Sequence, residues 1–233
     1  MENILIGKHA VVEAIQAGRT INKVSLQKDL QPKAVKDLVS LLDEYQVVYN
    51  WVEKAKLDSY GTGHQGVIAF VSATDYTAWQ DFAKGGLIVA LDGITDPHNL
   101  GAIIRSAYSF GAEGLIIPKR RSASVDEVVH KASAGAASHL PISRVSNLGF
   151  ALDELKKRGY WVYGAEAHDA TELGAVQFAP ASVIVIGSED EGISAQLKKR
   201  CDVLFRIETT HFESLNASVA AGIGFYAYRL KQK

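Results

Sequence analysis

The chain has 233 residues, of which 47% are hydrophobic and 22% charged, which is enough to build one or two globular cores. Its formal net charge of −1 argues against a protein that holds nucleic acid by bulk charge, although local patches such as Lys119-Arg120-Arg121 are compatible with it. No apolar run approaches the roughly 20 residues of a membrane span, and no signal peptide is indicated. The single cysteine, Cys201, cannot form an intrachain disulfide, so we expect a reduced, cytoplasmic setting.

Residues 1–71 predict a small α/β domain. An amphipathic helix is expected at 9–17, a strand at 23–26, a helix from Pro32 to Tyr45, and strands at 47–51 and 67–71. Before the last strand, His64-Gln65-Gly66 is either a loop that contacts RNA or a plain polar turn. The polar, irregular segment 72–86 is interpreted as a linker between two domains.

From Leu87 to the end, strands and helices alternate. Alternation of this kind predicts an α/β domain, residues 87–233, with a parallel sheet and helices on both faces. Strands are expected at 87–91, 114–117, from 142, 160–165, 182–186 and 203–207; helices are expected at 99–110, 125–134, 148–158, 193–200 and from Ser214.

Polar residues follow three of these strands, where ligands bind in open parallel sheets. The first group runs from Asn99 to Arg105, the second is Gly187-Ser188-Glu189-Asp190-Glu191-Gly192, and the third is Ser214-Leu215-Asn216. Ser214 is expected to cap the last helix, with Asn216 in its first turn. The unpaired N–H groups at such a helix start attract an anion or a polar ligand edge, although an ordinary capped helix would look the same.

Arg105 stands in an otherwise apolar helical stretch and needs a partner if it faces inward. Glu189 is the natural candidate. Either the two form a structural ion pair, or the guanidinium holds a phosphate or acts on a hydroxyl group. The residues alone leave both interpretations open.

Several common sites are missing from the sequence. No Gly-x-Gly-x-x-Gly follows a strand, so the dinucleotide-binding fingerprint is absent, and no phosphate-binding loop ends in Gly-Lys-Ser/Thr. Gly-x-Ser-x-Gly does not occur, which argues against a hydrolase nucleophile elbow. The seven histidines are scattered and give no metal-ligand spacing.

Taken together, the three polar groups resemble motifs 1, 2 and 3 of the SpoU/TrmH family, the S-adenosylmethionine-dependent RNA 2′-O-ribose methyltransferases of the SPOUT class. Residues 1–71 resemble the RNA-binding domain of family members that act on large-subunit rRNA, which is ribosomal protein L30e-like. Gly7-Lys8-His9-Ala10-Val11 and His64-Gln65-Gly66 carry that likeness. The type most similar to this chain methylates a guanosine of bacterial 23S rRNA. A tRNA methyltransferase and a non-catalytic RNA-binding or ribosome assembly factor are the alternatives.

The resemblance implies a catalytic domain with a deep trefoil knot, which is an exception to the rule that chains do not thread. It also implies a homodimer joined through the catalytic domain, with S-adenosylmethionine as co-substrate and no metal. By motif position, the cofactor pocket is formed by Gly187, Ile207 and Leu215, and the catalytic set is Asn99, Arg105, Glu189, Ser214 and Asn216. Since arginine stays protonated, Arg105 is expected to orient the ribose hydroxyl and stabilise charge rather than act as a base.

One stretch departs from the family pattern. After Ile207 the family continues with Pro-Met-x-Gly, whereas this chain has Glu208-Thr209-Thr210-His211-Phe212-Glu213, and Asp190 stands where glycine is usual. This loop borders the expected cofactor pocket. The departure therefore raises the question whether the pocket is preserved, and it motivates the alternative of a non-catalytic RNA-binding factor.

Overall fold

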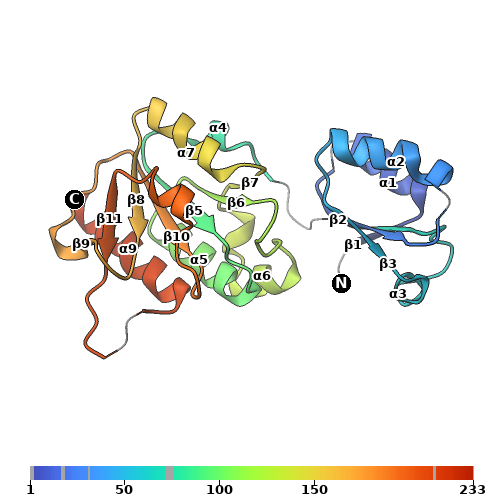
Figure 1. Ribbon diagram of the computed structural model, residues 1–233. Helices are drawn as coiled ribbons and strands as arrows, with labels where there is room; N and C mark the ends of the chain where they lie inside the picture. The colour runs from blue at the N-terminus through green and yellow to red at the C-terminus, as the bar shows by residue number, and fades with distance from the viewer. Residues whose placement is uncertain (1–2, 17–18, 31, 72–75, 212–213, 233) are drawn as a thin grey trace. The chain divides into compact units, whose positions relative to one another are not determined.

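The computed structural model describes residues 3–16, 19–30, 32–71, 76–211 and 214–232 (Figure 1). The chain divides into two compact units, Met1–Asp75 and Tyr76–Lys233. Each unit has a β-sheet of its own. Among the described residues, no helix is long and apolar enough to cross a membrane.

The smaller unit is an α/β domain, as predicted. Its elements are β1 (Asn3–Ile6), α1 (Lys8–Gln16), β2 (Ile21–Gln27), α2 (Pro32–Glu44), β3 (Tyr49–Val52), α3 (Lys54–Asp58) and β4 (Val67–Val71). The strand order is β1-β4-β2-β3, with β4 antiparallel to both neighbours and β2 parallel to β3. Helices α1 and α2 cover one face of this sheet, where Val24 and Leu26 are buried, and Leu57 of α3 packs on the other face.

The turn before β4 shows how His64 is used in the fold. His64 is only 6% exposed, and its Nδ1 accepts a hydrogen bond of 2.9 Å from the Gly66 N–H. The ring proton is therefore on Nε2, which lies 2.9 Å from Asp58 Oδ1 and donates to it. Both nitrogens of His64 thus hold the turn, and the exposed member of the group is Gln65.

The larger unit contains a seven-stranded sheet in the order β7-β6-β5-β10-β8-β11-β9, in which every strand pair is parallel. Its elements are α4 (Trp79–Phe82), β5 (Leu87–Asp92), α5 (Pro97–Ser109), β6 (Gly114–Pro118), α6 (Glu127–Ala132), the 3₁₀ helix η1 (Ala136–Ser138), β7 (Ile142–Val145), α7 (Leu148–Lys157), β8 (Trp161–Ala165), β9 (Thr171–Glu172), the 3₁₀ helix η2 (Leu173–Ala175), β10 (Ser182–Gly187), α8 (Ala195–Lys198), β11 (Val203–Arg206) and α9 (Ala217–Lys231).

Helices cover both faces of this sheet, as the alternating pattern predicted (Figure 1). Successive side chains of a strand point to opposite faces. In β5, Leu87, Val89 and Leu91 pack with α5, α6 and α9, while Ile88 and Ala90 pack with α4, α7 and α8. Because both faces of the sheet are covered, its strands can be apolar along their whole length. This continuous apolar run is the pattern that predicted the strands from the sequence.

The segment interpreted as a linker contains ordered structure in its second half. Trp79 and Phe82 of α4 are buried in the larger unit, and Tyr76 Oη accepts a hydrogen bond from the Val125 N–H. Residues 72–75 lie outside the described part of the chain. Among the expected helices, 125–134 and 193–200 are shortened to Glu127–Ala132 and Ala195–Lys198.

Candidate active site

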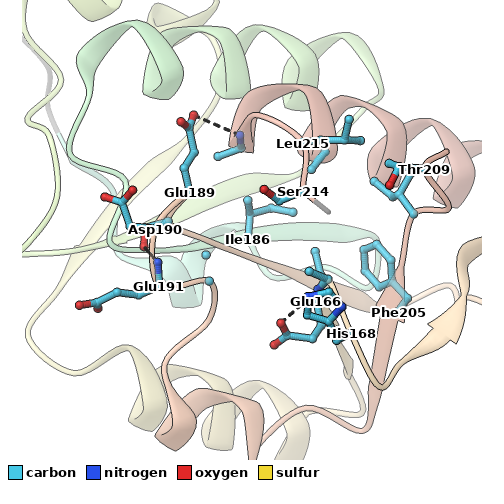
Figure 2. Close-up of a pocket in the computed structure, with 18 residues that line it drawn as sticks. Glu166, His168, Ile186, Glu189, Asp190, Glu191, Phe205, Thr209, Ser214 and Leu215 are labelled. Carbon is cyan, nitrogen blue, oxygen red and sulfur yellow. Dashed lines mark hydrogen bonds between the residues drawn. The ribbon is translucent and has the colours of Figure 1, made fainter. Parts of the chain in front are cut away.

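The carboxyl ends of β8, β10 and β11 enclose a cavity of about 320 Å³, which lies within the usual size range of small-molecule pockets. Figure 2 shows the side chains around it, with Glu189 and Glu191 on one side and Glu166, His168 and Phe205 across from them. The cavity is lined by Ala165, Glu166, Ala167, His168, Ile186, Gly187, Ser188, Glu189, Asp190, Glu191, Gly192, Phe205, Ile207, Thr209, Ser214, Leu215, Ala217 and Ala220. The predicted cofactor residues Gly187, Ile207 and Leu215 are all among them.

The loop after β10 forms one wall of the cavity and is tightly closed. The Ser188 N–H donates to the Gly192 carbonyl at 3.2 Å, and the Gly192 N–H donates to the Ser188 carbonyl at 2.9 Å. The Asp92 carboxylate at the end of β5 accepts from the Ser194 N–H at 2.8 Å. At Gly187 an added Cβ would lie 2.0 Å from the Gly192 carbonyl carbon, so only glycine fits where β10 enters this loop.

Glu189 is the centre of a hydrogen-bond network that joins the starts of two helices. Its Oε1 accepts from Asn99 Nδ2 of α5 at 2.8 Å and from Asn216 Nδ2 through a short contact. Asn216 Nδ2 also donates to Asn99 Oδ1 at 3.0 Å, so each side chain contacts the other two. In addition, Glu189 accepts from the Ala217 N–H at 3.3 Å, which places a carboxylate at the positive end of α9. We call Asn99, Glu189 and Asn216 the Glu189 network.

Asn216, not Ser214, caps the last helix. Its Oδ1 accepts from the Ser218 N–H at 3.0 Å and the Val219 N–H at 3.4 Å, so α9 begins at Ala217. The prediction that Ser214 is the cap is therefore wrong. Asparagine and serine cap helices about equally well, so residue type alone does not decide between them. Hydrogen bonds to Asn99 and Glu189 hold the Asn216 side chain in the capping position. Ser214 is exposed and lines the cavity.

Arg105 does not pair with Glu189. It is exposed on α5 and forms no ion pair with any residue in the described part of the chain. Six residues of helix separate it from Asn99, which turns its side chain about 120° away from the face that meets Glu189. The structural ion pair is thus the wrong interpretation, and the guanidinium is available to a partner from outside the chain.

The cavity carries a negative charge. Four of its lining residues are carboxylates (Glu166, Glu189, Asp190 and Glu191), and Lys and Arg are absent from the lining among residues whose positions are described. Two of these carboxylates have cationic neighbours outside the lining, because Lys198 pairs with Glu166 and Arg121 with Glu191. Such a cavity favours a positively charged ligand. No group of His, Cys, Asp or Glu in the described ranges is arranged to hold a metal ion.

The sequence analysis did not predict that the residues directly after β8 form part of the cavity wall. Glu166 and His168 line the cavity directly after this strand, and Phe205 of β11 closes its base. The same rule that singled out the other strand ends applies to residues 166–168, since β8 ends at Ala165 beside β10. They were overlooked because the segment has no recognisable motif.

The described part of the loop that departs from the family pattern borders the cavity. Thr209 is part of the lining, and Glu208, Thr210 and His211 are exposed. Phe212 and Glu213 lie outside the described residues.

Comparison with known proteins matches both units to family models. Residues 86–226 match the SpoU rRNA Methylase family, and residues 4–77 match the RNA 2′-O ribose methyltransferase substrate-binding domain. A Staphylococcus haemolyticus protein named for the TrmH family of tRNA/rRNA methyltransferases is 43% identical over 244 residues, covering 100% of this chain and 98% of the relative. A Staphylococcus aureus relative of the same name is 40% identical, with 97% and 94% covered.

Solved structures share the fold of this chain. The SpoU methyltransferase AviRb of Streptomyces viridochromogenes, crystallised with S-adenosylmethionine, has a TM-score of 0.65 at 24% identity and covers 99% of this chain and 90% of its own. The TrmH/SpoU tRNA modifying enzyme of A. aeolicus has a TM-score of 0.59 at 25% identity, covering 65% of this chain and 77% of its own. On the match of residues 86–226 and the 43% identity of a full-length relative, the chain belongs to the SpoU rRNA Methylase family of TrmH-type methyltransferases.

Proposed function

We propose that this protein transfers a methyl group from S-adenosylmethionine to a ribose 2′-hydroxyl of RNA. The observation that carries the proposal is the Glu189 network at the rim of a cavity of about 320 Å³, at the strand ends where the three family motifs meet. Titration calorimetry with S-adenosylmethionine, followed by transfer of labelled methyl to unmodified RNA, tests it. Tight RNA binding without cofactor binding would favour the non-catalytic RNA-binding factor instead.

The residues of the cavity fit S-adenosylmethionine. Ile186, Ile207 and Leu215 offer apolar contact to an adenine ring, and the tight turn at Gly187 exposes backbone groups at the cavity wall. The carboxylates of the lining complement the sulfonium and ammonium charges of the cofactor. When bound, the cofactor supplies an already activated methyl group, so the reaction requires no metal.

The protein residues act on the nucleophile. As the ribose oxygen bonds to the methyl carbon, the carbon–sulfur bond of the donor breaks to leave a neutral thioether, and the hydroxyl proton passes to water. A cation nearby would stabilise the negative charge that develops on the oxygen. Arg105 does not line the cavity, but it is exposed and unpaired among the described residues, and we assign its guanidinium to orient the hydroxyl or an adjacent phosphate of the bound RNA. Asn99 and Asn216 hold Glu189 at the cavity rim, where Ser214 offers a further hydroxyl to the substrate.

For the substrate, we favour a guanosine of large-subunit 23S rRNA, with tRNA as the alternative. A separate N-terminal unit supports this choice, since residues 4–77 match a substrate-binding domain. The A. aeolicus tRNA modifying enzyme aligns with only 65% of this chain, whereas an rRNA methyltransferase of Sinorhizobium meliloti, of 21% identity and TM-score 0.62, aligns with 97%. Parallel assays with 23S rRNA and tRNA transcripts decide between the two substrates.

A homodimer through the larger unit forms part of the proposal. Val219, Ile223, Tyr226 and Leu230 recur at helical spacing on α9 and are all exposed, which leaves an apolar stripe along the helix. Helix α5 packs beside it, since the Phe110 and Tyr226 rings lie 5.7 Å apart. Light scattering of the wild-type protein and of Ile223→Glu tests the stripe: the wild type should have twice the monomer mass and the variant the monomer mass.

The trefoil knot is proposed for residues of the same unit. The tight loop after β10 and the segment from β11 to α9 both border the cavity, which is where a threaded chain would form the pocket. Refolding kinetics from denaturant, slower than expected for a sheet of this size, would support a threading step.

A further inference from the structure

Four cations gather beside the candidate active site, and the chemistry above uses none of them. Lys119, Arg120 and Arg121 directly follow β6, and Arg144 lies in the neighbouring strand β7. The two segments are joined because the Lys119 N–H donates to the Val145 carbonyl at 2.8 Å, and Arg144 Nη2 donates to the Lys119 carbonyl at 3.3 Å. We call Lys119, Arg120, Arg121 and Arg144 the basic cluster.

Lys119 and Arg144 of the basic cluster are partly buried, whereas Arg120 and Arg121 are exposed. The Arg144 guanidinium lies 5.6 Å from the centre of the Tyr76 ring, and Tyr76 in turn is hydrogen bonded to the Val125 N–H. Lys119 is half-buried, and burial, reinforced by the nearby Arg144 charge, lowers the pKa of its ammonium group. The fold thus holds two like charges together with part of their water removed, and a bound anion would offset the repulsion.

Two members of the basic cluster have no acidic partner among the described residues. Neither Lys119 nor Arg120 forms an ion pair with a residue in the described ranges. Arg121 is paired, since its Nη2 donates to Glu191 Oε2 at 2.8 Å, and Glu191 lines the cavity. This ion pair ties the basic cluster to the wall of the cavity.

The sheet order fixes how far the cluster lies from the cavity. β6 is two strands from β10, and strands are spaced about 4.8 Å apart, so the carboxyl ends of β6 and β10 are separated by roughly 10 Å. One RNA segment can span this distance. The cavity is lined by carboxylates and repels phosphates, whereas the basic cluster attracts them.

We propose that the basic cluster binds backbone phosphates of the RNA next to the nucleotide whose ribose enters the active site. Phosphate contacts set the register and orientation of a nucleic acid without reading its sequence. With a net charge of −1, the protein has no general attraction for RNA, so its affinity must come from local clusters of this kind. The inference rests on the proposed function, because it assumes that RNA is the substrate.

The test compares two double variants that each remove two positive charges. Lys119→Ala with Arg120→Ala removes the two unpaired members of the basic cluster and relieves the repulsion at Lys119. Lys84→Ala with Lys199→Ala is the matched control, because both side chains are exposed, neither forms an ion pair with a residue in the described ranges, and they precede β5 and β11 at the amino-terminal ends of the strands. Filter binding with radiolabelled 23S rRNA and tRNA transcripts gives the affinity over a series of KCl concentrations.

Of the two RNAs, the one that the wild-type protein binds more tightly should bind the cluster variant more weakly. The magnitude of the slope of log affinity against log salt should fall by roughly 1.4, as expected for two lost phosphate contacts to single-stranded RNA. The control should keep the wild-type slope, and calorimetry should show wild-type affinity for S-adenosylmethionine in both variants. A wild-type slope in the cluster variant, or an equal loss in the control, would overturn the inference. Absence of methyl transfer by the wild-type protein would instead overturn the proposed function, and the salt slopes would still decide whether the cluster binds RNA.

Discussion

Gly187 offers the sharpest test of how the cavity is built. An alanine Cβ at this position would lie 2.0 Å from Gly192 C and 2.2 Å from Ile193 N, whereas ordinary van der Waals contact begins near 3.4 Å. These atoms belong to the backbone, so a side-chain rotation cannot relieve the clash. The loop that forms one wall of the cavity must move by more than an ångström in Gly187→Ala.

We expect two consequences of this shift. Overpacking of this kind costs about 1–3 kcal/mol, which lowers the thermal midpoint of a unit of this size by roughly 2–12 °C. S-adenosylmethionine binding, measured by calorimetry, should weaken far more than the stability loss accounts for, because the displaced atoms line the cavity.

The control is Gly174→Ala, where an added Cβ meets nothing within 4 Å and the backbone needs no positive φ. It should keep both the wild-type midpoint and the wild-type cofactor affinity. If Gly187→Ala bound the cofactor as tightly as the wild type, the cavity described here would not be the cofactor pocket.

Three further predictions concern single residues. Asn216→Ala should lose about 1 kcal/mol of stability with the α9 cap and also lose methyl transfer. Asn216→Ser keeps a capping oxygen but removes the amide donor to Glu189, so it should keep most of the stability and still lose transfer, as read by scanning calorimetry and labelled-methyl assays. Arg105→Ala should abolish transfer while leaving the midpoint and cofactor affinity unchanged; a large drop in the midpoint would mean that the side chain has a structural role. Burial, and to a smaller extent the negative charge of the neighbouring Asp202, raises the pKa of the Cys201 thiol from 9.0 to about 12. At pH 8 the thiol should therefore react with Ellman's reagent only when the protein unfolds. Because the unfolded thiol ionises first, Cys201 should lower stability progressively above about pH 9, and rapid labelling of the folded protein would contradict its burial.

The parallel sheet could be predicted because its signal is local. Leu87 to Leu91 is apolar throughout, which is typical of a strand covered on both faces, and Gly111 and Gly159 end the helices that follow β5 and β7. β1 escaped prediction because only Gly7 separates its four residues from α1, so no distinct strand pattern precedes the helix. Helix α4 escaped because a single turn leaves no periodic pattern.

The site was predictable only in part, for a geometric reason. Strand ends meet at one edge of a parallel sheet, so Asn99, Glu189 and Asn216 could be grouped from the sequence. Which side chain contacts which depends on the angular position of each residue around its helix, and that angle cannot be read from the sequence. The pairing of Arg105 with Glu189 was therefore wrong, and the bond that Glu189 makes instead to Asn99 could not be foreseen.

The most direct measurement of the central claim is the chemical position of the transferred methyl group. Wild-type protein would be incubated with labelled S-adenosylmethionine and unmodified 23S rRNA or tRNA transcripts, and the RNA then hydrolysed in alkali. A methyl on the 2′-oxygen blocks cleavage of the adjacent phosphodiester bond, so the account predicts label in alkali-resistant dinucleotides. Label in mononucleotides would mean methylation of a base, and no label in either RNA would contradict the assignment of these transcripts as substrates of a 2′-O-ribose methyltransferase.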